Sequence, residues 1–331
     1  MSHQSLPILQ KNGPSPAPSP TVHPQEFFLA NEDAAILKKA MRGFGTNEKS
    51  IINVLTKRSL AQRLEIINQY NNLYKTNLLK EFKSELSGNF RKLIQALMTP
   101  LPQFYAKELH YATKGLGTNE HILIEILCTV KHSQIAAIQH AYHHKYKKTL
   151  DSDVRADTSG DFKSLLVSLI NAKRDESTTT NLEQAKADAM SLYKAGEKRW
   201  GTDESTFNRI LCFQSFAQLQ LVFEHYDIIS GHSIEKAIEN EFSGSAKDCL
   251  LSIIQCVRNT PAFLAKQLHK SVKGLGTNDR DLRRLIVTRC EIDMGDIKKE
   301  YQAKYSESLA DAIKGDSSGD YKKCMLTLIG E

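Results

Sequence analysis

The chain has 331 residues, in which 44 lysines and arginines stand against 38 aspartates and glutamates, giving a formal net charge of +6. This length can bury a substantial core, as two domains or as one large repeat array, and excludes a peptide-sized scaffold. The cationic surplus is small and dispersed, which argues against a nucleic-acid tract, so we expect no nucleic-acid partner.

The N-terminus lacks the cationic start and apolar run of a secretory signal, and no stretch is long and apolar enough to span a bilayer. We therefore expect a cytoplasmic protein. Six cysteines are scattered through apolar helical segments without CxxC spacing. This pattern indicates reduced thiols that act as small hydrophobic side chains.

Residues 1–24 form a distinct N-terminal segment. They include the Pro- and Ser-rich stretch GPSPAPSP at 13–20 and show no helical periodicity, which predicts an extended tail. The stretch SLPILQ at 5–10 offers apolar side chains to a protein partner, although Pro7 interrupts any helix there.

The rest of the chain has the periodicity of helices, with apolar residues recurring at intervals of three and four, and predicts an all-α fold. Within it, four similar loops recur, each with a large apolar residue before the last glycine. In chain order they are MRGFGTNE (41–48), TKGLGTNE (113–120), KRWGTDE (198–204) and VKGLGTND (272–279).

Fixed offsets tie each loop to later residues. A carboxylate follows each loop threonine by thirty-nine positions, a tyrosine by twenty-four, and a Leu or Ile by thirty-two. Four copies of the same three offsets establish a repeat unit. The threonines are Thr46, Thr118, Thr202 and Thr277, and the carboxylates are Glu85, Asp157, Glu241 and Asp316.

The spacing divides the array into two pairs of units. We predict repeats at 25–98, 99–170, 182–257 and 258–331, and a polar linker, NAKRDESTTTN, at 171–181. The linker accounts for the longer distance between the second and third loops.

Each loop has the composition of a calcium site. Glycines allow several backbone carbonyls to point at one spot, and the threonine is expected to cap the next helix. Converging carbonyls and one carboxylate form an oxygen-only site, which suits Ca²⁺. Three carbonyls and one bidentate carboxylate supply about five oxygens, whereas Ca²⁺ takes about six to eight, so water or a phosphoryl oxygen must complete the shell.

Apolar and cationic side chains beside an incomplete calcium shell match a phospholipid surface, which offers an acyl boundary, phosphate and negative potential. Trp200, the only tryptophan, belongs at headgroup level, where amphipathic rings are favoured. The expected membrane contacts are the cations and apolar residues Arg42, Phe44, Lys114, Leu116, Lys198, Trp200, Lys273 and Leu275.

The stretches GFGT, GLGT, RWGT and GLGT, each with its distal acidic residue, resemble the calcium-binding repeats of the annexins over residues 25 to 331. The resemblance implies four repeats of about five helices in a curved disc, with calcium loops on the convex face. It implies calcium-dependent, reversible binding to acidic phospholipid and a tail able to recruit a protein partner. Neither a nucleophile–base constellation nor a pair of acids can be picked out in the sequence, so we expect no enzymatic activity.

The resemblance also implies the ligands of each calcium ion. The third loop departs from the pattern because Arg199 replaces its first glycine, and Glu197 is an alternative to Gly196 there. The implied carbonyl and carboxylate sets are Met41, Gly43, Gly45 and Glu85; Thr113, Gly115, Gly117 and Asp157; Gly196, Arg199, Gly201 and Glu241; and Val272, Gly274, Gly276 and Asp316.

Two other interpretations arise from the sequence. His140 and His144 are spaced to hold a transition metal on a helix, but no nearby cysteine or carboxylate completes the set, so a solvated helical face is the favoured explanation. Ion conduction along a polar axis is the alternative function, because the resemblance places four polar residues there, of which Glu125 and Arg284 resemble a charge pair. A structural salt bridge is the competing explanation for that pair. The four residues are Asn53, Glu125, Arg209 and Arg284.

Overall fold

The computed structural model describes residues 17–43, 45–115, 117–171, 173–197, 201–273 and 276–331, and this part of the chain contains helices and no strands. The all-α prediction is confirmed. The helices are α1 (Ala30–Ala40), α2 (Glu48–Leu55), α3 (Leu60–Tyr74), α4 (Leu78–Glu85), α5 (Gly88–Leu97), α6 (Leu101–Ala112), α7 (Glu120–Thr129), α8 (His132–Tyr146), α9 (Leu150–Asp157), α10 (Gly160–Asn171), α11 (Leu182–Ala195), α12 (Glu204–Phe213), α13 (Phe216–Ser230), α14 (Ile234–Glu241), α15 (Gly244–Val272), α16 (Asp279–Arg289), α17 (Met294–Tyr305), α18 (Leu309–Asp316) and α19 (Gly319–Leu328).

The longest helix, α15, consists of two helices that meet at Asn259, whose φ of −161° and ψ of 95° are not helical. The Asn259 side chain accepts a hydrogen bond from the N–H of Ala262 at 2.9 Å and so caps the second half, near Pro261. With its halves counted separately, each repeat has five helices, as the resemblance implied.

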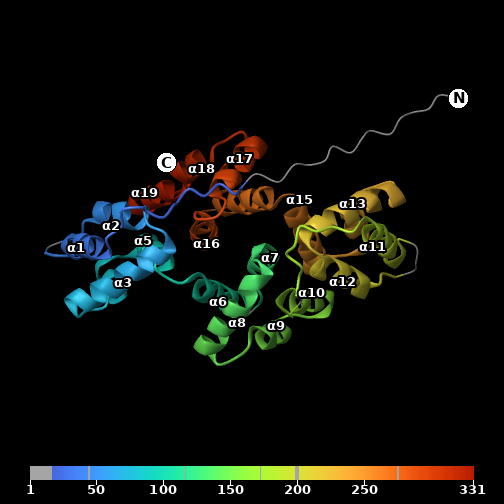
Figure 1. The fold of residues 1–331 in the computed structure, drawn as a ribbon, viewed down its shortest axis with the longest axis horizontal. Helices are drawn as coiled ribbons and strands as arrows, with labels where there is room; N and C mark the ends of the chain where they lie inside the picture. The colour runs from blue at the N-terminus through green and yellow to red at the C-terminus, as the bar shows by residue number, and fades with distance from the viewer. Residues whose placement is uncertain (1–16, 44, 116, 172, 198–200, 274–275) are drawn as a thin grey trace.

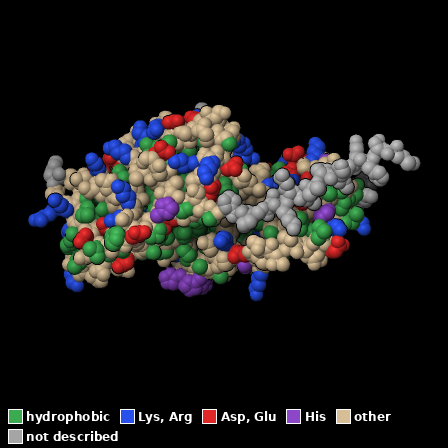
Figure 2. Space-filling model, turned by 45° about the horizontal axis from the view of Figure 1, so that its top comes forward, with side chains coloured by type: hydrophobic (Ala, Val, Ile, Leu, Met, Phe, Trp, Pro, Cys, Tyr) green, Lys and Arg blue, Asp and Glu red, His purple; other side chains and the backbone are tan. Residues whose placement is uncertain are grey.

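The repeats follow one another around a flattened ring (Figure 1). Repeat 4 closes the ring on repeat 1, because α16 and α19 pack against α5. The long helix α15 leads from repeat 3 to repeat 4 and contacts α7 of repeat 2. On the face in Figure 2, Lys and Arg side chains lie among Asp and Glu side chains rather than in one large patch.

The sequence offsets correspond to the core and to helix starts. The four repeated tyrosines are fully buried, and the repeated Leu or Ile is the first residue of the fourth helix of each repeat. The residue before it caps that helix, because its side chain accepts a hydrogen bond from the N–H three positions later. The tyrosines are Tyr70, Tyr142, Tyr226 and Tyr301, and the caps are Asn77, Thr149, Ser233 and Ser308.

The described end of the predicted tail is bound to repeat 4. The Thr21 N–H donates to the carbonyl of Cys290 at 2.8 Å, and its hydroxyl donates to the carbonyl of Leu328 at 2.6 Å. The Gly295 N–H donates to the carbonyl of Ser19 at 2.7 Å, and the Val22 side chain is buried. Residues 19–22 therefore form a strap that ends beside repeat 1.

The linker predicted at 171–181 is also fastened. The Arg174 guanidinium donates to the carbonyls of Leu211 and Gln214, both at 2.7 Å, at the end of α12. A cation at a helix C-terminus satisfies carbonyls that have no partner within the helix. The described part of the linker is therefore held against repeat 3 at Arg174. All six cysteines are buried free thiols, as the sequence indicated.

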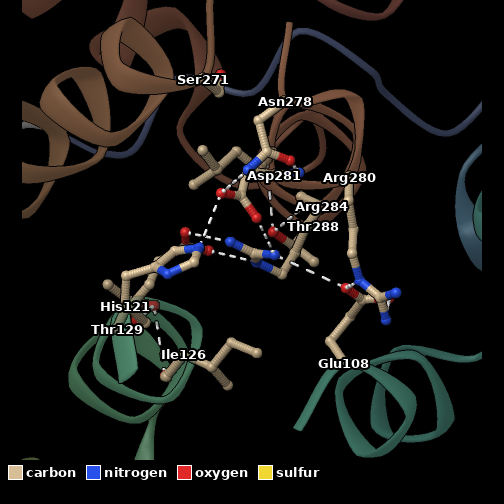
Figure 3. Close-up of polar contacts among 12 residues, drawn as sticks. Glu108, His121, Ile126, Thr129, Ser271, Asn278, Arg280, Asp281, Arg284 and Thr288 are labelled. Carbon is tan, nitrogen blue, oxygen red and sulfur yellow. Dashed lines mark hydrogen bonds and ion pairs between the residues drawn. The ribbon is translucent and has the colours of Figure 1, made fainter. Parts of the chain in front are cut away.

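A buried ion-pair network joins repeat 4 to repeat 2. The fully buried Arg284 donates through Nε and Nη2 to the two carboxylate oxygens of Glu125, at 2.8 and 2.6 Å, and through Nη1 to Asp281 at 2.8 Å. Figure 3 shows this guanidinium between Asp281 and Glu108. Of the four residues expected near a polar axis, these contacts join Glu125 and Arg284, whereas Asn53 and Arg209 are exposed.

We expect Glu125→Ala to lower the free energy of unfolding by about 3–5 kcal/mol, because it leaves the buried charge of Arg284 without its main partner. Urea denaturation followed by circular dichroism measures this effect. The control is Glu183→Ala, which removes an exposed pair with Lys186 and should leave stability nearly unchanged. Equal stabilities for the two variants would contradict the role of the buried pair.

Candidate functional site

Each of the four loops connects the first helix of a repeat to the second. Gly43, Gly45, Gly115 and Gly117 have φ between 88° and 122°, in the region that favours glycine. These glycines let the chain turn sharply. Seven residues predicted to bind calcium or membrane lie outside the described residues: Phe44, Leu116, Lys198, Arg199, Trp200, Gly274 and Leu275.

One backbone hydrogen bond closes every loop in the same way. The residue after the loop threonine donates its N–H to a carbonyl in the last turn of the preceding helix or its end, at 2.8 to 2.9 Å. The expectation that the threonine caps the next helix is wrong, because this following residue holds the cap position. The capping residues are Asn47, Asn119, Asp203 and Asn278.

The threonine instead reaches the distal acidic residue, which explains the offset of thirty-nine. Thr46 and Thr202 donate to the carboxylates of Glu85 and Glu241, at 3.3 and 2.8 Å. In the repeats with aspartate, the hydroxyl donates to the backbone carbonyl of that residue instead. These contacts are Thr118 to Asp157 at 2.8 Å and Thr277 to Asp316 at 2.9 Å.

The two aspartates are consequently left with an unsatisfied oxygen. Oδ2 of Asp157 and Oδ2 of Asp316 are buried and have no hydrogen-bond partner. A buried carboxylate oxygen without a partner is costly, and a coordinated cation would compensate it. The second and fourth loops therefore fit a metal ion that takes oxygen ligands, which is the chemistry expected of Ca²⁺.

The third loop differs from the others. Gly196 has a φ of −100° and is buried at the end of α11. The neighbouring Glu197 carboxylate accepts a hydrogen bond from the Tyr226 hydroxyl at 2.7 Å and lies 3.0 Å from Nε2 of His232. These contacts engage the Glu197 carboxylate, whereas the alternative calcium ligand is the Glu197 backbone carbonyl.

In repeats 1 and 2 the repeated tyrosine has a different acceptor. Tyr70 donates to Glu81 at 2.6 Å, and Tyr142 donates to Asp153 at 2.7 Å. Burial, together with the Glu81 charge, raises the pKa of Tyr70 well above its usual value, so the hydroxyl keeps its proton. Sequence reasoning found the tyrosine but missed its carboxylate partners, which the offsets of thirty-five from Thr46 and Thr118 could have indicated.

The described membrane-contact candidates are exposed. Arg42, Lys114 and Lys273 all lie in the loops with exposed side chains, and Lys273 pairs with Glu307 at 3.0 Å. By contrast, the side chains of Met41 and Val272, whose carbonyls are the candidate ligands, are buried. The helix ends are thus anchored in the core while the loops face solvent.

The two histidines that were considered as ligands of a transition metal lie on a helix and not in a loop. His140 and His144 are exposed on α8. Within the described ranges, no group of three or more His, Cys, Asp or Glu side chains is arranged to hold a metal ion, and no helix is long and apolar enough to cross a bilayer. A calcium loop built from backbone carbonyls and one carboxylate contains a single such side chain, so this absence does not bear on the loop sites.

Comparison with known proteins gives one consistent result. The family model described as Annexin matches residues 32–97, 104–169, 187–253 and 263–328. Human annexin A3 is 48% identical over 310 residues, covering 94% of this chain and 96% of that protein. The solved structure of annexin III superposes with a TM-score of 0.93 at 47% identity, covering 95% and 98% of the two chains. The structure of calcium-bound annexin (Sm)1 superposes with a TM-score of 0.88 at 37% identity, covering 95% of this chain and 93% of that chain.

We expect the double variant Asp157→Asn, Asp316→Asn to lose part of the thermal stabilisation that millimolar calcium gives the wild type. An amide lacks the charge that holds the ion, and each occupied site contributes about 1.4 kcal/mol when calcium is at about ten times its dissociation constant. Without calcium, the variant should be at least as stable, because an unpaired buried carboxylate is gone.

Scanning calorimetry with calcium and with chelator measures both effects. Asp161→Asn is the control, since Asp161 is exposed at the start of α10. A calcium-induced rise in melting temperature as large in the double variant as in the control would exclude the two aspartates as ligands.

Proposed function

The chain belongs to the annexin family, and from that premise we propose that it binds acidic phospholipid membranes reversibly when calcium rises. The observation that carries the proposal is the pair of buried, unpartnered oxygens on Asp157 and Asp316, each beside a glycine loop. A calcium-bound annexin among the similar structures supports the choice of ion. The proposed role is binding, because the loop sites are built from groups that ligate a cation.

We assign each ion three loop carbonyls and one distal carboxylate, as the resemblance implies. The hydrogen bond from the loop threonine to the acidic residue supports this grouping, because it holds the carboxylate-bearing residue next to the loop. The proposed ligands are Met41, Gly43, Gly45 and Glu85; Thr113, Gly115, Gly117 and Asp157; Gly196, Arg199, Gly201 and Glu241; and Val272, Gly274, Gly276 and Asp316.

Membrane contact follows from the incomplete shell. A lipid phosphoryl oxygen completes the coordination, while an adjacent cation meets the negative surface potential and an apolar side chain enters the acyl boundary. We propose that such a protein is cytoplasmic, becomes peripheral on membranes when calcium rises, and uses its N-terminal tail to bind a protein partner. The proposed contacts are Arg42, Phe44, Lys114, Leu116, Lys198, Trp200, Lys273 and Leu275.

We expect the protein to sediment with phosphatidylserine vesicles in calcium and to be released by chelator. Replacing Glu85, Asp157, Glu241 and Asp316 together by Ala removes the side-chain charge of every proposed site, so half-maximal binding should require at least about tenfold more calcium. Unchanged calcium dependence in a variant with a normal helical spectrum would sink the assignment. A calcium-dependent current across a planar bilayer would favour the conduction alternative, since adsorption alone gives none.

The sole indole provides an independent measurement. If Trp200 enters the interface, calcium and anionic vesicles together should shift its emission to the blue and make it sensitive to quenchers on acyl chains. Trp200→Ala should weaken vesicle binding modestly without changing the melting temperature. Emission that stays constant in a sample shown by sedimentation to be bound would falsify insertion of this residue.

A further inference from the structure

A polar cavity of about 410 Å³ lies between α5, α6 and α16, where repeats 1, 2 and 4 meet. Four cations and two carboxylates line it: Lys92, Lys107, Arg280, Arg283, Glu108 and Asp279. Both carboxylates already have partners in the protein. Glu108 accepts two hydrogen bonds from Arg280, at 2.7 and 3.1 Å, and Asp279 accepts one from the side-chain amide of Asn89.

Arg283 is the unusual member of this lining. Only 8% of the residue is exposed, and its one hydrogen bond goes to the backbone carbonyl of Asp279 at 3.4 Å. No carboxylate of the described residues lies within ion-pair distance of it, whereas the next residue, Arg284, is bonded to both Glu125 and Asp281. A buried cation without a counter-charge is costly unless an anion compensates it.

The electrostatics of the cavity agree with this geometry. Burial lowers the pKa of Arg283. The Glu108 charge opposes this effect without cancelling it, and the nearby Arg280 lowers the pKa further. Partial desolvation lowers the pKa of Lys107. The Glu108 charge opposes this effect, whereas Lys145, Arg280 and Arg283 lower the pKa further. Each of these groups would hold its proton more firmly if an anion occupied the cavity.

The repeats supply an internal control. A second cavity, of about 300 Å³, lies between α7 and the two halves of α15 and is lined from equivalent positions. Phe263 and Lys266 stand there in the places of Phe104 and Lys107, at the same distances before their loop threonines. The two cavities are therefore products of the same repeat architecture.

The cationic character is confined to the first cavity. Ile124 occupies the position of Arg283 in the second cavity, and Asp248 occupies that of Lys92. Repeat 1 also has a buried isoleucine, Ile52, at this position. Since the fold accepts a buried Ile there twice, packing does not require the arginine.

The first cavity adjoins three of the loops. Asn89 comes four residues after Glu85, Asp279 comes two residues after Thr277, and Tyr111 comes two residues before Thr113. Its volume is in the range of small-ligand sites.

We propose that this cavity binds a phosphate monoester, held by Arg283 and Lys107. Four cations against two carboxylates leave an excess of positive charge that matches the roughly −1.5 to −2 charge of a phosphate monoester near neutral pH. Arginine suits this ligand because its planar guanidinium can donate two parallel hydrogen bonds to phosphate oxygens. The ligand is either a soluble phosphorylated metabolite or the headgroup of a phosphorylated lipid.

The test uses the full chain in chelator, so that the calcium loops take no part. Inositol trisphosphate, titrated by calorimetry, is the soluble probe, and phosphatidylcholine vesicles containing phosphatidylinositol bisphosphate are the lipid probe in sedimentation. Binding of the soluble probe alone identifies a metabolite site. Binding to the vesicles as well identifies a headgroup site. Failure to bind either probe overturns the proposal.

Arg283→Ile should weaken binding of the probes about tenfold or more, because it removes a charge-assisted contact. The variant introduces the side chain that repeats 1 and 2 already carry at this position. Lys107→Gln, at an exposed residue, should weaken binding several-fold and gives a second test. Lys266→Gln, in the equivalent cavity, is the matched control and should bind as the wild type does.

The site would be refuted if Arg283→Ile and Lys107→Gln both bound the probes with wild-type affinity. It would also be refuted if Lys266→Gln lost as much affinity as these two variants. Calcium-dependent sedimentation of Arg283→Ile with phosphatidylserine vesicles should match that of the wild type. This comparison keeps a failure of the phosphate site distinct from a failure of the calcium loops.

Discussion

The hydrogen bond from the loop threonine to an acidic residue thirty-nine positions later organises each repeat. It fastens the loop after the first helix to the end of the fourth, two points that the chain alone does not hold together. This contact holds the glycine loop next to the residue that carries the carboxylate. The remaining parts of the repeat, the buried tyrosine and the capped start of the fourth helix, fix the position of the element that carries the acid.

Much of this could be predicted from sequence because the repeat provides four samples of the same unit. The offsets located the tyrosine, the first residue of the fourth helix and the acidic residue. The offsets could not show which partner the side chain of the threonine bonds to. The threonine was expected to cap the next helix, which is a local interaction. Its hydroxyl instead donates to the distant acidic residue, and the Asn or Asp that follows the threonine takes the cap position.

Contacts that the repeat offsets do not encode were the least predictable part of the structure. Arg174, Glu197 and the pair of Glu108 with Arg280 bond to partners far along the chain, and no periodicity links them. The difference between Glu and Asp at the distal position also has a consequence that the sequence did not reveal. With aspartate, whose side chain is one methylene shorter, the threonine bonds to the backbone, and the carboxylate oxygen keeps its coordination capacity.

The strap at residues 19–22 gives the array a property that linear repeat proteins lack. An open solenoid can fray from either end, because a terminal repeat has one neighbour. Here repeat 4 packs against repeat 1 and is also held by the segment that precedes repeat 1. Repeats 1 and 4 therefore each cover part of the other, so opening one disturbs the other. The ring consequently gains the cooperativity of a closed circle, in which the order of the repeats along the chain no longer determines which one unfolds first.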